Sequence, residues 1–141
     1  MRAPSIGETT RSLARVEGAL VVAVIASGLA LPERIAAVLD PARVIIDAIR
    51  TPEELARMRA HLALVDATDP IDCDPARIAG ALSSAPLVLV WGAEESAAVT
   101  LSRELERAKV AVMTFARDDA EALIDVLRSR AGEGHFPPPW R

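Results

Sequence analysis

Five short apolar runs alternate with segments that carry helix-start signals, and this alternation limits the fold more than any other feature of the chain. The runs have the length of buried strands and span 19–26 (ALVVAVIA), 43–49 (RVIIDAI), 62–65 (LALV), 87–91 (LVLVW) and 110–115 (VAVMTF). Continuous apolar strands separated by helices are typical of a parallel sheet that is covered on both faces. The sequence therefore predicts an α/β fold with five strands.

Each segment that follows a run begins with a proline, an N-capping side chain or a glycine. These signals are Pro32, Thr51 with Glu54, Asp74 with Pro75, Gly92, and Asp118 with Glu121. Apolar residues at helical spacing follow them: Ile35, Val38 and Leu39; Leu55, Met58 and Leu62; Ile78 and Leu82; Ala97, Leu101, Leu105 and Ala108; and Ala120, Leu123, Ile124 and Leu127. The pattern predicts five helices, each with one buried face.

The order of these elements is (βα)5, which restricts the connections between strands. Crossovers between parallel strands are right-handed, and a doubly wound five-stranded sheet of strand order 2-1-3-4-5 satisfies that rule most economically. A Rossmann-type order is an alternative that periodicity alone leaves open.

The length and composition suit one compact domain. The chain has 141 residues, 51% of them apolar, which is enough for a substantial core. We expect the domain to span 18–131, after a flexible polar lead-in at 1–17 and before a Pro-rich tail at 132–141. That tail is interpreted either as a linker stub or as a segment that docks through Phe136 and Trp140.

Charge and cysteine content narrow the partners and the location. The net charge is −4 and the basic residues form no cluster, so neither nucleic acid nor a membrane surface is an expected partner. The apolar stretch 19–31 is too short to span a bilayer, and we do not expect it to direct export. The single cysteine, Cys73, is compatible with a reducing compartment. The expected location is the cytoplasm.

In a doubly wound sheet the ligand site lies outside the carboxyl ends of the strands. The segment 62–74, LALVDATDPIDCD, ends the third strand and is the most informative in the chain. Asp66 with Pro70 resembles the phospho-acceptor spacing of response-regulator receiver domains. The resemblance covers about residues 18–130 and implies a flavodoxin-like fold with Asp66 as the phospho-acceptor.

The positions that should surround this aspartate depart from the receiver pattern. The resemblance implies an acidic pair after the first strand, a hydroxyl after the fourth and a lysine after the fifth. The sequence has Ala26 and Ser27, Trp91 or Gly92, and Phe115 at those places. Mg²⁺ usually needs one or two carboxylates, and phosphoryl transfer needs its developing charge neutralised. We therefore expect a degenerate pocket with Asp66 inactive and with no metal or cofactor.

Other interpretations of these residues stay open. Asp66 would equally serve to cap its loop, and Trp91 would either fill the emptied pocket or stack on a small ligand. The aspartates between 66 and 74 lack the glycine and glutamate of an EF-hand loop. Ser27 with Gly28 lacks the spacing of a phosphate-binding loop, and no motif places a histidine beside Cys73.

The leading hypothesis is a pseudo-receiver, a non-enzymatic protein-interaction module of bacterial signal transduction that works without phosphorylation. The alternatives are a receiver still phosphorylated on Asp66 and a flavodoxin-like small-molecule binder. The partner would be a protein, or a second copy that pairs through the fourth helix, fifth strand and fifth helix. Helical geometry turns outward the charged residues Arg103, Glu106, Arg107, Glu121, Asp125 and Arg128, which would cross-pair in such a dimer.

Overall fold

The computed structural model describes residues 19–51, 54, 60–68, 74–83 and 85–133. The predicted lead-in, most of the predicted second helix, and residues 134–141 of the predicted tail, with Phe136 and Trp140, lie outside these residues. The first two residues of that tail, 132–133, belong to the last helix. The elements, in chain order, are β1 (Leu20–Ile25), α2 (Ala30–Ala36), β2 (Val44–Ile49), β3 (Leu62–Asp66), α3 (Pro75–Ala81), β4 (Val88–Trp91), α4 (Ser96–Arg107), β5 (Val112–Phe115) and α5 (Ala120–Glu133).

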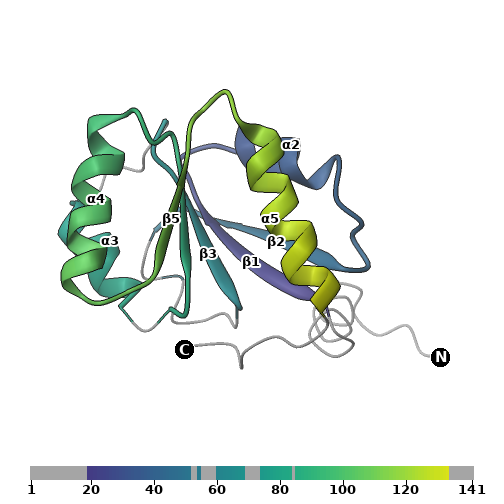
Figure 1. The fold of residues 1–141 in the computed structure, drawn as a ribbon, viewed down its shortest axis with the longest axis horizontal. Helices are drawn as coiled ribbons and strands as arrows, with labels where there is room; N and C mark the ends of the chain where they lie inside the picture. Colours follow the sequence, from purple (N-terminus) through teal and green to yellow (C-terminus); the bar gives the residue numbers. More distant parts are fainter. Residues whose placement is uncertain (1–18, 52–53, 55–59, 69–73, 84, 134–141) are drawn as a thin grey trace.

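The five strands form one parallel sheet of order β2-β1-β3-β4-β5 (Figure 1). The predicted α/β class, the doubly wound topology and the strand order are confirmed, and the Rossmann-type order is excluded. The fold is flavodoxin-like.

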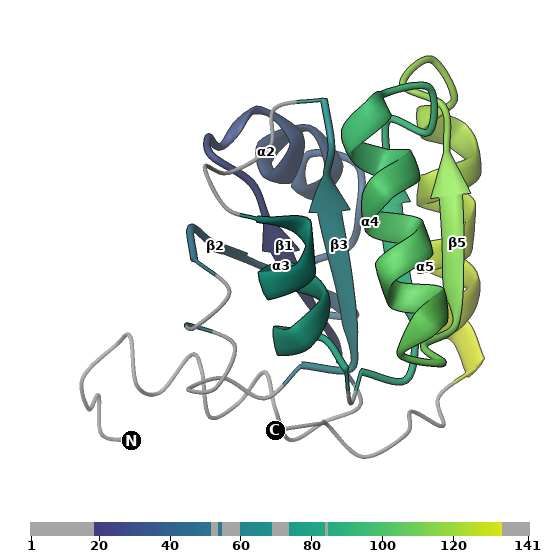
Figure 2. The ribbon, with the colours of Figure 1, turned by 90° about the vertical axis from the view of Figure 1, so that its left-hand side faces the viewer.

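Helices cover both faces of the sheet. In Figure 2, α3 and α4 lie on one face, while α2 and α5 lie on the other. Alternate residues of β1 enter the two cores: Val21, Ala23 and Ile25 pack with α3 and α4, whereas Leu20, Val22 and Val24 pack on the α2 and α5 side. The central strands are buried on both faces, which is why they appear in the sequence as continuous apolar runs.

The predicted buried faces of the helices are largely confirmed, with three corrections. Val38 is 47% exposed, because α2 ends at Ala36 and the helical register no longer turns this side chain inward. Ala108 is exposed because it follows the last residue of α4, and Ala98 is buried in that helix. Leu62 belongs to β3 and not to the second helix.

Of the predicted caps, the one at Asp74 is confirmed, the Thr51 and Glu54 pair forms in part, and the one at Asp118 is wrong. The Asp74 carboxylate accepts the Ala76 N–H at 3.2 Å. The Glu54 carboxylate accepts the Thr51 N–H at 3.2 Å, although the Thr51 hydroxyl also donates to it and does not itself cap. At α5 the capping residue is Asp119 and not Asp118, since its carboxylate accepts the Ala122 N–H at 3.2 Å.

Within the described residues, no helix has both the length and the apolar character needed to cross a membrane. The longest of them, α5, has 14 residues and carries Glu121, Asp125 and Arg128 on its exposed side.

A buried histidine joins the start of β3 to β1. The backbone N–H of His61 donates to the Val21 carbonyl at 2.8 Å, and the backbone N–H of Val21 donates to the ring Nδ1 of His61 at 3.0 Å. A ring nitrogen that accepts a hydrogen bond carries no proton, so the imidazole is neutral here. Burial lowers the pKa of His61 from its ordinary value of 6.5.

The protein should therefore lose stability in mild acid through His61. The unfolded chain binds a proton near pH 6.5 and the folded chain does so only at lower pH. This contribution is complete above that pH and is lost as the pH falls below it, with a slope of at most about 1.4 kcal/mol per pH unit. The free energy of unfolding, measured with urea at several pH values between 5 and 7, should change less steeply with pH in His61→Asn than in the unaltered protein. The asparagine amide oxygen accepts a hydrogen bond but does not titrate. Equal slopes in both proteins would contradict the assignment.

Candidate functional site

Four of the predicted pocket positions form a single row across the carboxyl edge of the sheet. The register pairs Asp66 with Trp91 and Trp91 with Phe115. Ile25 pairs with Val65, so Ala26 follows as the neighbour of Asp66. Paired residues of parallel strands point to the same face, and Ala26, Trp91 and Phe115 all belong to the core on the α2 and α5 side.

Aromatic side chains fill one half of this row. Trp91 is 4% exposed and Phe115 is 7% exposed. The Arg34 guanidinium of α2 lies over the Trp91 ring, 5.7 Å from its centroid, which is a cation–π distance. The resemblance implied a hydroxyl and a lysine where these two rings lie.

Asp66 is 5% exposed, and its carboxylate is engaged by its own loop. Its Oδ1 accepts the Thr68 N–H at 3.0 Å and the Thr68 hydroxyl at 2.6 Å. An aspartate bonded to the backbone two residues on forms an Asx-turn. The aspartate therefore caps the turn after β3. The Asp-x-Thr spacing of Asp66 and Thr68 is the sequence signal for this turn.

Ser27 and Gly92 lie beside the row. Ser27 is exposed after β1. Gly92 is buried and has a φ of +94°, a backbone conformation that residues other than glycine rarely adopt. A Cβ on Gly92 would lie 2.6 Å from Cγ2 and 3.2 Å from the backbone nitrogen of Thr68. The glycine thus lets the loop after β4 approach the turn that Asp66 caps.

The loops after β4 and β5 are bonded to each other. The Gly92 and Ala93 N–H groups donate to the Phe115 carbonyl at 2.7 and 2.9 Å. The Arg117 N–H donates to the Glu94 carboxylate at 3.1 Å. The Arg117 guanidinium pairs with the carboxylate of Glu95 and lies 3.9 Å from that of Glu94.

The charge of Arg117 is therefore already matched by carboxylates at the end of β5. Hydrogen bonds from the Glu94 backbone N–H and from that of Arg117, together with the Arg117 charge, hold the pKa of Glu94 below its usual value despite some desolvation. Lys109 precedes β5 and so lies at the opposite edge of the sheet. No spacing in the sequence predicts the pairing of Arg117 with Glu94 and Glu95, because it joins residues of two separate loops.

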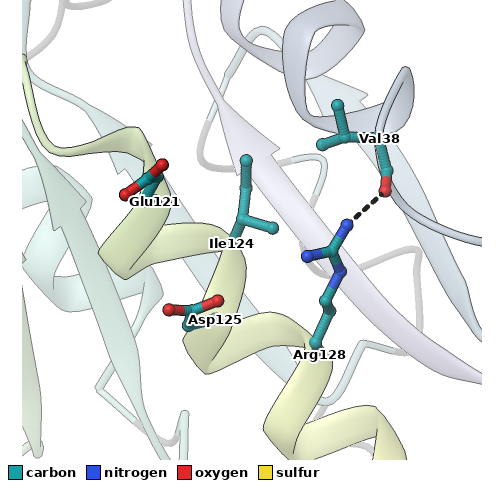
Figure 3. Close-up of a pocket in the computed structure, with 5 residues that line it drawn as sticks. All are labelled: Val38, Glu121, Ile124, Asp125 and Arg128. Carbon is teal, nitrogen blue, oxygen red and sulfur yellow. Dashed lines mark hydrogen bonds between the residues drawn. The ribbon is translucent and has the colours of Figure 1, made fainter.

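The charged residues of the predicted dimer face lie on two different layers. Arg103, Glu106 and Arg107 are exposed on α4, where Arg107 pairs with Glu104 at 3.3 Å. On the opposite face of the sheet, α5 carries Glu121, Asp125 and Arg128, and the Arg128 guanidinium donates to the Val38 carbonyl at 3.0 Å (Figure 2, Figure 3). Within one chain the structure does not bring the two sets together.

No cluster of three or more histidine, cysteine or carboxylate side chains suited to a metal ion occurs among the residues that the structure describes. Asp66 and Asp74 lie at the two ends of the acidic loop, and its middle, residues 69–73, is not among the described residues. Cys73 belongs to that middle part.

Comparisons of the chain with protein-family models, with curated proteins and with solved structures gave no match. The functional interpretation therefore depends on the geometry at the carboxyl edge of the sheet.

Proposed function

We propose that the chain is a pseudo-receiver, a protein-interaction module of cytoplasmic bacterial signalling that works without phosphorylation. The observation that carries the proposal is the row at the carboxyl edge. Trp91 and Phe115 are buried there beside Asp66, in the positions where receiver chemistry needs a hydroxyl and a lysine.

The row lacks the groups that phosphoryl transfer requires. Catalysis of that reaction depends on positioning and on neutralising the charge of the equatorial oxygens. Ala26 provides no metal ligand, Trp91 has no hydroxyl, and Phe115 has no charge. The nearest cation of the β5 loop, Arg117, is paired with Glu94 and Glu95, and Asp66 is bonded to Thr68.

The two alternatives have weaker support. A receiver that still accepts phosphate on Asp66 would need the carboxylate released from Thr68 and a cation supplied from elsewhere. A flavodoxin-like small-molecule binder would use the carboxyl-end crevice, where the Trp91 and Phe115 rings are buried. The homodimer through α4, β5 and α5 stays a prediction.

Incubation with acetyl phosphate and Mg²⁺ should leave Asp66 unmodified, because no group in the row stabilises the transferred phosphoryl group. Intact-mass spectrometry at successive times checks this, with a receiver domain that accepts phosphate from acetyl phosphate treated in parallel. Asp66→Asn is the matched variant. A phosphate adduct on the unaltered chain that disappears in Asp66→Asn would refute the proposal in favour of the phosphorylated receiver.

A further inference from the structure

The layer formed by α2 and α5 carries a groove that the proposed function does not use. Its volume is about 440 Å³. Five side chains line it (Figure 3): Val38, Glu121, Ile124, Asp125 and Arg128. Val38 is 47% exposed and Ile124 is partly exposed, so the groove presents two apolar side chains to solvent. Exposed apolar side chains that lie together in a concave surface are typical of an interaction site.

The three charged side chains of the groove differ in their partners. The Arg128 guanidinium of α5 donates to the Val38 carbonyl at 3.0 Å, and so it connects α5 to the segment that follows α2 at one end of the groove (Figure 3). Glu121 and Asp125 lie one helical turn apart on α5 and are both exposed. Neither carboxylate has a hydrogen-bond or ion-pair partner within the described residues. The groove lining therefore carries two carboxylates without a partner in the described part of the chain and one guanidinium, that of Arg128, which is bonded to a neutral carbonyl, so its net charge is −1.

The charged residues of α2 do not neutralise the two carboxylates. Arg34 is the cation of that helix, and it lies over Trp91 at the carboxyl edge of the sheet. Glu33, its neighbour, is exposed and acidic. The part of the groove formed by Glu121 and Asp125, away from the Arg128 contact with Val38, thus favours cationic groups.

We infer that this groove binds a basic amphipathic segment of a protein partner, an inference that rests on the proposed function as an interaction module. An apolar side chain of the segment contacts Val38 and Ile124, and lysine or arginine side chains one turn away face Glu121 and Asp125. Four of the five lining residues are exposed. A groove this open would bury little of a small molecule, whereas a helix lies along such a surface with its apolar side inward.

A synthetic helical peptide of alanine, leucine and lysine, with its leucines on one side and lysines flanking them, tests the inference. Titrated into the isotopically labelled full chain, it should shift the NMR signals of Val38, Glu121, Ile124 and Asp125. The double variant Glu121→Gln, Asp125→Asn should bind it on the order of fivefold to tenfold more weakly, because two exposed charge pairs are lost. Val38→Ser should also weaken binding. All three positions are exposed, so these variants should keep the fold.

Glu106→Gln on α4 removes one negative charge outside the groove and should leave the affinity unchanged. A peptide in which glutamate replaces lysine should not bind. Equal affinity in the double variant, shifts spread over both layers, or no binding of the lysine peptide would overturn the inference. These outcomes leave the proposed function standing if Asp66 still fails to accept phosphate, so the two failures can be told apart.

Discussion

Replacing Trp91 with alanine should lower the free energy of unfolding by about 3–5 kcal/mol, which is the usual cost of removing a large buried aromatic side chain. Trp91 is 4% exposed and belongs to the core between the sheet and the α2 and α5 layer. Its removal leaves a cavity beside Asp66 and Phe115 and takes away the ring on which Arg34 lies. Urea unfolding followed by circular dichroism measures the loss.

Met113→Ala on the neighbouring strand is the control. Met113 is 37% exposed on an edge strand, so its truncation should cost less than about 1 kcal/mol. A similarly small cost for Trp91→Ala would mean that the ring does not fill the crevice. The proposed function would then lose the observation that carries it, and the small-molecule binder would gain support.

Gly92→Ala should be the second most damaging of these substitutions, at about 2–4 kcal/mol. Backbone strain at a φ of +94° costs about 1–3 kcal/mol for a residue with a Cβ. The new Cβ would also lie 2.6 Å from Cγ2 of Thr68, and a backbone nitrogen 3.2 Å away limits how far the loop can shift. The same unfolding measurement checks this expectation.

Two variants separate strain from crowding at this position. Combining Gly92→Ala with Thr68→Ser removes the methyl group in the way but keeps the hydroxyl that Asp66 accepts, so it should recover part of the loss. Gly80→Ala places a Cβ on helix α3 with no heavy atom within 4 Å and should be neutral or stabilise by up to about 1 kcal/mol. Equal effects at Gly80 and Gly92 would contradict the structural argument.

Helix boundaries show where local patterns fall short. Two adjacent aspartates precede α5, and the capping-box spacing selected Asp118, while the structure uses Asp119 because the helix begins at Ala120. Val38 has helical spacing from Ile35, yet the helix has ended by then. Periodicity indicates which face is buried, but it does not specify the residue at which a helix stops.

The candidate site was predictable in part. The positions Ala26, Asp66, Trp91 and Phe115 follow from the strand ends, because parallel strands bring their carboxyl ends to one edge. The contacts that define the site were not predictable. Arg34 over Trp91 and Arg117 with Glu95 each join segments distant in sequence, and no spacing rule relates them.

The sequence by itself determined the strands and most of the buried helix faces, and it limited the order of the sheet to two candidates, between which the structure decided. Continuous apolar runs must be covered on both faces, and right-handed crossovers then leave few topologies. Only the tertiary structure decided which charged side chains share a surface. Arg128 is directed to the Val38 carbonyl beside Glu121 and Asp125, on the layer opposite Arg103 and Arg107. The physical reason is that periodicity sets whether a side chain faces the core, whereas the packing of whole helices on the sheet sets its neighbours.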